Sequence, residues 1–227
     1  MTAPDSNISP PGKDEAEQPP SRGGRLGTAG DLVNRRLGGA RGLQRRYLDN
    51  ESQGRADLAA LRKAVSAAPG EHPEIWSLTE VRDTKVVGDD PTWEEIAVHT
   101  AMTLYAVHQQ SRTDPMFKPG HGLGRAARQL IGSAEDENPS ARARFNALVT
   151  STTVSELRHH LRGFVSQLRA RSIPLDHAML ADDLVHFQRP GGAKNVRLRW
   201  SRQYAWLLTS SDTVSASTDP TPSNPEN

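Results

Sequence analysis

Arginines recur beside expected helix starts and along expected helix faces in three stretches of the chain, residues 122–128, 144–148 and 159–163. The planar guanidinium group can donate hydrogen bonds to two phosphate oxygens at once, so ordered arginines suit a surface that follows a nucleic-acid backbone. No set of residues with catalytic spacing accompanies them. The sequence leaves open the alternative that these arginines only line a solvated helix face.

One expected helix places three of these cations together. Arg158, Arg162 and Arg169 fall within about 40° of one another around the helix axis at 100° per residue, beside the apolar face. This spacing predicts a cationic ridge. The alternative is that the arginine stems cover the edge of the core while the charged heads stay in water.

Residues 120–124 read Gly-His-Gly-Leu-Gly and invite comparison with phosphate-binding loops, because glycines at a helix start let backbone N–H groups approach an anion. No Gly-Lys-Ser/Thr sequence follows and no hydrophobic strand precedes, so the stretch is not a nucleotide fingerprint. We interpret it as a turn into a helix. Arg125 and Arg128, one turn apart and off the apolar stripe, are the stronger candidates for binding.

Groups that could catalyse a reaction or hold a metal are scattered. The chain has eight histidines and no cysteine. His159 and His160 are adjacent and would point apart on a helix, and no His-Glu-x-x-His pattern occurs. His108 lies on an inward helical stripe, where a buried, hydrogen-bonded histidine is the expected role. We therefore predict a protein that is not an enzyme and needs no cofactor or metal.

Charge is sorted along a chain whose net charge is only +1. Residues 22–63 hold ten basic and four acidic residues, residues 71–96 hold two and eight, and residues 156–202 hold nine and four. This pattern favours one basic surface for a polyanion and another surface for protein partners. With no secretion signal and no apolar stretch near the ~20 residues of a membrane span, we expect a cytoplasmic protein without membrane contact.

Composition divides the chain into three parts. Residues 1–55 are expected to form a disordered, partly basic N-terminal extension, although residues 31–54 could form a broken helix interrupted by glycines. That basic arm could be a floppy extension or a nucleic-acid contact. Residues 56–208 form one domain, and residues 209–227 form a disordered tail rich in Ser, Thr, Asp and Pro.

The domain reads as helices almost throughout, which predicts an all-α fold, a compact bundle of about six to eight helices. Helix starts are expected near Asp90, with Thr92 as an alternative cap, and at Asn138, Thr153 and Asp176. The last helix carries apolar residues at steps of four, four and three from Val196. Residues 196–200 also alternate as a strand would, but their continuation favours a helix.

Six short motifs occur in register over residues 57–206 and together resemble the CasB family, the small subunit of the type I-E CRISPR surveillance complex Cascade. They lie at residues 61–64 (LRKA), 107–111 (VHQQS), 122–126 (GLGRA), 144–148 (RFNAL), 161–163 (LRG) and 173–176 (IPLD).

The resemblance implies a non-enzymatic, all-helical subunit that is present as a pair in a complex guided by crRNA. It implies that basic surfaces hold the target and displaced DNA strands of the R-loop. It also implies contacts with a second copy, with the large PAM-reading subunit and with the repeated backbone subunits. In physical terms, base pairing reads the sequence while such a subunit supplies phosphate contacts.

Carried over by position, the resemblance implies nucleic-acid contacts on the first helix of the domain, in the glycine-rich motif, before the phenylalanine of the fourth motif and in the C-terminal basic turn. These residues are Arg62 and Lys63, Arg125, Arg142 or Arg144, and Lys194 with Arg197. The family usually has Ser where Gly122 stands, so we expect no hydroxyl contact there. Residues 22–55 lie outside the resemblance.

Two other classes of protein remain as alternatives. An adaptor would use its sorted charges to dock proteins, with nucleic acid only passing nearby. A free DNA-binding regulator would need a helix-turn-helix reader, and no short helix pair with base-reading residues is evident.

Overall fold

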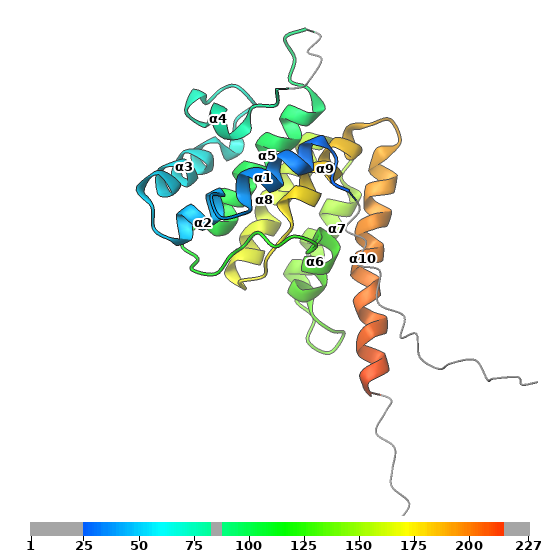
Figure 1. Ribbon diagram of the computed structural model, residues 1–227. Helices are drawn as coiled ribbons and strands as arrows, with labels where there is room; N and C mark the ends of the chain where they lie inside the picture. Colours follow the sequence, from blue (N-terminus) through cyan, green and yellow to red (C-terminus); the bar gives the residue numbers. More distant parts are fainter. Residues whose placement is uncertain (1–24, 83–87, 216–227) are drawn as a thin grey trace, which may run out of the picture.

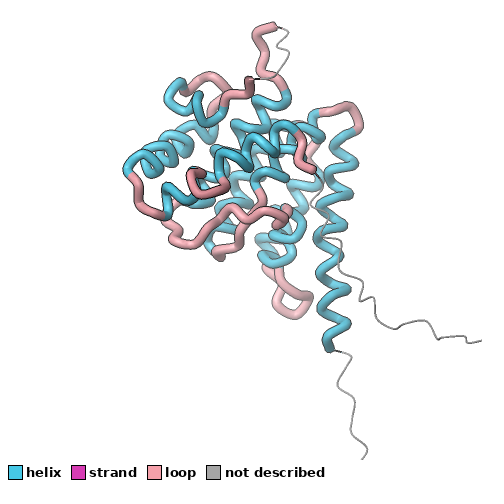
Figure 2. Tube along the Cα trace, viewed as in Figure 1, coloured by secondary structure: helices cyan, strands magenta, loops and turns pink. Residues whose placement is uncertain are grey.

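The computed structural model describes residues 25–82 and 88–215, with the backbone alone for residues 206–215. This part of the chain is helical and contains no strand, which confirms the predicted all-α fold (Figures 1 and 2). One isolated β-bridge links Phe117 to Leu175. The α-helices are α1 (Thr28–Leu37), α2 (Leu43–Leu48), α3 (Ser52–Lys63), α4 (Trp76–Thr79), α5 (Trp93–Gln109), α6 (Leu123–Ile131), α7 (Pro139–Thr150), α8 (Val154–Ala170), α9 (His177–Gln188) and α10 (Gly192–Ser215), and the 3-10 helices are η1 (Ala64–Ser66) and η2 (Pro73–Ile75).

Helix α5 forms the centre of the bundle and packs against α1, α3, α8 and α9 (Figure 1). It is buried on every side, not along the single inward stripe that the sequence predicts, because neighbouring helices cover all of its faces. Its two ends differ. Trp93 is 43% exposed in the first turn, whereas Tyr105 and His108 near the other end are fully buried.

Side-chain caps start four of the helices. Thr92 and Glu95 form a reciprocal capping box on α5, so the helix begins after the alternative cap Thr92, and the expected start near Asp90 is wrong. The side chains of Asn138, Thr153 and Asp176 accept backbone N–H bonds at the starts of α7, α8 and α9. These three starts are confirmed, and they fix where the arginines that follow lie on each helix.

The prediction that residues 1–55 form a disordered extension is wrong for residues 25–55. Helices α1 and α2 form there, and Val33, Leu37 and Leu43 are completely buried. Gly30 lets α1 approach α9 closely. A Cβ at Gly30 would lie 2.8 Å from the Ala178 carbonyl oxygen.

Two hydrogen bonds to α9 also anchor the start of α1. The backbone N–H groups of Gly27 and Gly30 both donate to the Asp182 carboxylate of α9, each at 2.8 Å. The folded unit therefore begins well before residue 56. These added helices, with the short α4, bring the number of α-helices in the described residues to ten.

Helix α10 confirms the helical interpretation of residues 196–200. Val196 and Trp200 are fully buried, and the indole Nε1–H of Trp200 donates to Asp183 of α9 at 2.6 Å. The helix continues to Ser215, past the predicted start of the tail at residue 209. The disorder predicted for residues 1–24 and 216–227 falls outside the described residues.

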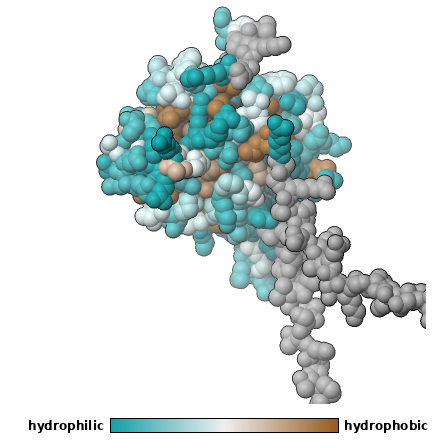
Figure 3. Space-filling view, in the orientation of Figure 1, coloured by the Kyte–Doolittle hydropathy of each residue, from teal (hydrophilic) through white to brown (hydrophobic). Residues whose placement is uncertain are grey.

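The exterior visible in Figure 3 is largely hydrophilic, with hydrophobic side chains in small, separate patches. No helix in the described part of the chain is long and apolar enough to cross a membrane.

Candidate nucleic-acid interface

The end of α3 and the face of α8 meet at η1. Arg62 and Lys63 occupy the last turn of α3, which leads directly into η1. From α8, Arg162 Nη1 donates to Ser66 Oγ at 2.5 Å and Arg158 Nη2 donates to the Ala67 carbonyl at 2.9 Å. The fold therefore brings two predicted sets of cations, far apart in the sequence, to the same place.

The cations at this junction differ in how much they can still bind. Arg158 is half-buried, and burial lowers its pKa. Arg169 of the predicted ridge donates to Gln110 Oε1 at 2.9 Å. The guanidinium groups of Arg158 and Arg169 therefore link separate segments of the fold. The side chains of Lys63 and Arg162, by contrast, are exposed to water. The ridge is only partly available to a ligand.

Arg144 of α7 adds a further cation to this group. Its guanidinium lies over Gly163 of α8, where an added Cβ would come 2.5 Å from Nη1. Gly163 follows Arg162 directly in the chain, so Arg144 reaches the helix that carries Arg162. We call Arg62, Lys63, Arg144 and Arg162 the basic band.

Arg128 of α6 and Arg142 of α7 both approach the ring of Tyr204 on α10. Their guanidinium carbons lie 5.9 and 5.4 Å from the ring centroid, which is within cation–π range. Phe145 stacks on the same ring with centroids 5.6 Å apart. We call these four residues the Tyr204 cluster.

Glu137 already binds one cation of this cluster. Its carboxylate pairs with Arg142 at 2.8 Å, and that hydrogen bond raises the pKa of Arg142 and lowers the pKa of Glu137. The pair is partly exposed, so a phosphate could displace the carboxylate at small free-energy cost.

Close packing accounts for the glycine-rich stretch. Gly122 and Gly124 lie against Gln203 and Trp200 of α10 with no room for a Cβ, and the Gly124 N–H donates to Gln203 Oε1 at 3.0 Å. The stretch therefore turns the chain into α6, as interpreted from the sequence. Arg125 is half-buried beside His121, whose pKa is lowered to about 4, first by burial and then by the Arg125 charge.

Lys194 and Arg197 lie in the first turns of α10. Arg197 donates to the carbonyl of Ser151 in the connection between α7 and α8, which gives it a structural contact. Lys194 is exposed. The structure does not join either residue to the basic band.

Within the described residues, no group of three or more His, Asp or Glu side chains is arranged to hold a metal ion. His108 is buried and hydrogen-bonded, as predicted, with Nδ1 3.1 Å from His177 Nε2 and Nε2 donating to the Ile173 carbonyl at 2.9 Å. What the arrangement offers chemically is a set of guanidinium and ammonium groups carried on helices, which can bind phosphate oxygens.

Sequence reasoning missed the polar roles of two residues. Tyr204 reads as part of the inward stripe of α10, yet it is half-buried between two arginines. Asp183 gives no signal in the sequence, but its buried carboxylate accepts from both Arg199 and Trp200. Only a tertiary contact could reveal either role.

Comparison with known proteins supports the same family as the sequence motifs. Residues 57–204 match the family model described as CRISPR-associated protein Cse2. The crystal structure of CasB from Thermobifida fusca shares 34% identity and a TM-score of 0.66, covering 79% of this chain and 98% of that one.

Two further crystal structures share the fold. A Cse2-family protein of Thermus thermophilus matches at 24% identity and a TM-score of 0.54, over 78% of this chain and 96% of its own. CasB of M. ruber matches at 23% identity and a TM-score of 0.57, over 84% of this chain and 99% of its own. Comparison with curated proteins gives no match.

Proposed function

The chain belongs to the CRISPR-associated Cse2 family, also called CasB, a subunit of Cascade, and we propose that it binds nucleic-acid backbone and stabilises the R-loop without catalysing a reaction. The observation that carries this proposal is that α8 contacts both neighbours of the basic band: Arg162 donates to Ser66 just after α3, and Arg144 of α7 lies over Gly163. Arg62, Lys63, Arg144 and Arg162 come from three helices and present no base-reading element.

The band suits this role because an R-loop is a nearly balanced exchange of one duplex for another. The heteroduplex is about as stable as the DNA duplex that it replaces, so contacts to backbone phosphates can tip the equilibrium. Each phosphate neutralised by Lys or Arg also releases condensed counterions, which favours binding at low salt. Neither effect requires a chemical step.

The Tyr204 cluster can supply cations but not a stacking platform. Arg128, Arg142 and Phe145 already cover the Tyr204 ring, so an unpaired base has little of its face to stack on. We expect Arg128 and Arg142 to contact phosphates, with crRNA or one of the two DNA strands as the source.

A second part of the surface suits protein partners. A hollow of about 210 Å³ is lined in part by Glu80, Asp89, Asp90 and Glu95, and Trp76 at its edge is 57% exposed. Acidic side chains repel a nucleic-acid backbone, and an exposed tryptophan is typical of protein interfaces. We place contacts with another Cascade subunit here, with a second copy, the large PAM-reading subunit and the backbone subunits as candidates, in a cytoplasmic complex.

Binding to labelled single-stranded and duplex DNA of several sequences, over a salt series, tests the proposal. We expect weak binding that falls steeply with salt and does not depend on sequence. Preference for one duplex sequence would indicate a regulator instead. Absence of binding at any salt concentration would indicate a protein-docking adaptor.

A further inference from the structure

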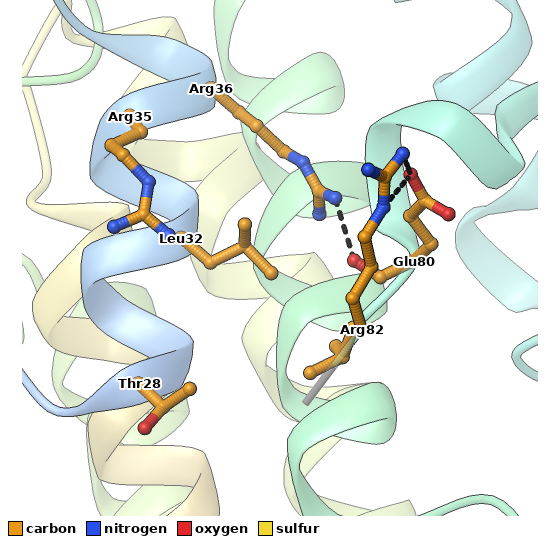
Figure 4. A pocket seen from close by; sticks show the side chains of 7 residues that line it. Thr28, Leu32, Arg35, Arg36, Glu80 and Arg82 are labelled. Carbon is orange, nitrogen blue, oxygen red and sulfur yellow. Dashed lines mark hydrogen bonds and ion pairs between the residues drawn. The ribbon is translucent and has the colours of Figure 1, made fainter. Parts of the chain in front are cut away.

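A hollow of about 320 Å³ lies between α1 and residues 80–82, which follow α4 in the chain. Figure 4 shows Arg36 reaching from α1 toward Glu80 and Arg82 on the opposite side, while Arg35 lies along α1 beside Leu32. Arg35 and Arg36 lie outside the residues matched by the family model. The basic band and the Tyr204 cluster contribute no residue to this hollow.

Arg36 is held in place with hydrogen-bonding capacity left over. Its Nη2 donates to the Glu80 carbonyl at 2.6 Å, as the dashed line in Figure 4 marks. Its Nη1 is buried and has no hydrogen-bond partner in the described structure. A guanidinium nitrogen that has lost water without gaining an acceptor is destabilising, so an anion that reached it would bind favourably.

The other two guanidinium groups are paired with carboxylates that can be displaced. Arg35 pairs with Asp31 one turn earlier on α1, and Arg82 pairs with Glu80 at 2.6 Å. Arg35 and Arg82 are both largely exposed, with 81% of the Arg82 side chain accessible. Such exposed pairs contribute little to stability, so an incoming anion can replace them.

We propose that Arg35, Arg36 and Arg82 form a phosphate-binding site. A tetrahedral phosphate offers oxygens in several directions and can accept from guanidinium groups on different sides of the hollow, whereas a single carboxylate offers two oxygens in one plane. The source of the phosphate rests on the proposed function. We favour the backbone of a bound nucleic-acid strand over free phosphate.

Titration with inorganic phosphate at constant ionic strength tests the site itself. The arginine Nε–Hε resonances of the full-length chain, followed by NMR, should show saturable shifts for Arg36 and Arg82 and none for Arg45. Arg45 is the matched control because it is exposed and paired with Asp49 on α2. Arg82→Gln, which removes a largely exposed side chain, should weaken phosphate binding at least threefold and leave the fold intact. If no resonance of the three arginines shifts saturably, the site is disproved, and it is also disproved if a glutamate-rich peptide shifts them and phosphate does not.

A second arm identifies the source. Affinity for labelled single-stranded DNA should fall in Arg35→Gln/Arg82→Gln and remain unchanged in Arg45→Gln, with the salt slope reduced by about 1.4 for two lost contacts. Phosphate binding with unchanged strand affinity would support the site and assign free phosphate to it. Failure of the proposed function is separate, because it would appear as unchanged strand affinity in basic-band variants.

Discussion

The guanidinium of Arg144 on α7 lies directly over Gly163 on α8, at a distance that leaves no room for a side chain there. The missing Cβ lets one helix present its cation against the backbone of the next. The basic band of the proposed nucleic-acid surface depends on this contact, because it brings α7 to the helix that carries Arg162.

Gly163→Ala should therefore separate stability from binding. The far end of the Arg144 side chain can move away, and alanine in a helix interior is favoured over glycine by about 0.5 to 1 kcal/mol. We expect a slightly higher melting temperature but weaker binding to single-stranded DNA, with a salt slope lower by about 0.7 if one phosphate contact is lost. Arg144→Gln is the matched comparison and should weaken binding without the gain in stability.

Arg158 and Arg162 should respond differently to substitution although they lie one turn apart on α8. Arg158 is half-buried and bonded to the Ala67 carbonyl, so Arg158→Met should lower the free energy of unfolding by about 1 to 2 kcal/mol. Arg162 is exposed, so Arg162→Gln should change stability by less than about 0.5 kcal/mol and reduce nucleic-acid binding. Chemical denaturation measures the first effect. Equal stability losses in the two variants would contradict this assignment.

The stability contributed by the buried pair His108 and His177 should fall as pH falls from about 6.5 toward 4. Burial lowers the pKa of His108 to about 4 and lowers the pKa of its neighbour His177. The unfolded chain, with ordinary histidine pKa values near 6.5, then binds more protons than the folded chain in this window, so acid favours unfolding. Denaturation midpoints at pH 7.5 and 5.0 check this. His108→Gln should flatten the dependence, whereas His159→Gln, at an exposed position, should not.

Much of the bundle could be predicted from the sequence because its signals are local. Side-chain caps at Asn138, Thr153 and Asp176 mark helix starts, and apolar spacing predicts which side of α8 is buried. The arginines on these helices could likewise be identified as candidates. Which of them remain available could not, because Arg158 and Arg197 bind carbonyl groups far away in the chain.

The N-terminal helices, in contrast, could not be predicted from local sequence signals. The glycines of residues 27–42 lower helix propensity, and the sequence contains no sign that Gly30 allows contact with Ala178 or that Asp182 accepts from Gly27. Tertiary packing outweighs propensity here. The same packing creates the Arg35, Arg36 and Arg82 hollow, which joins segments more than forty residues apart.

Truncation tests this view of the N-terminus. Removing residues 1–24 should leave the melting temperature nearly unchanged, because the contacts of α1 remain. Removing residues 1–38 should lower it by more than about 5 °C, because Val33 and Leu37 are fully buried. Equal melting temperatures for the two truncated proteins would show that α1 adds little to the fold.

If the basic band binds nucleic-acid backbone as proposed, reversing its charges should change the salt dependence of binding. The test protein carries Arg62→Glu, Lys63→Glu, Arg144→Glu and Arg162→Glu. The control protein carries the same charge change at exposed arginines outside the band: Arg45→Glu, Arg55→Glu, Arg171→Glu and Arg189→Glu.

Fluorescence anisotropy with labelled single-stranded DNA from 50 to 200 mM salt, roughly the range over which such contacts are resolved, measures affinity and slope for both proteins. We expect unchanged helical circular dichroism in both, with the slope reduced by about 3 in the band variant and much less in the control. An affinity and slope in the band variant equal to those of the control would contradict the proposal.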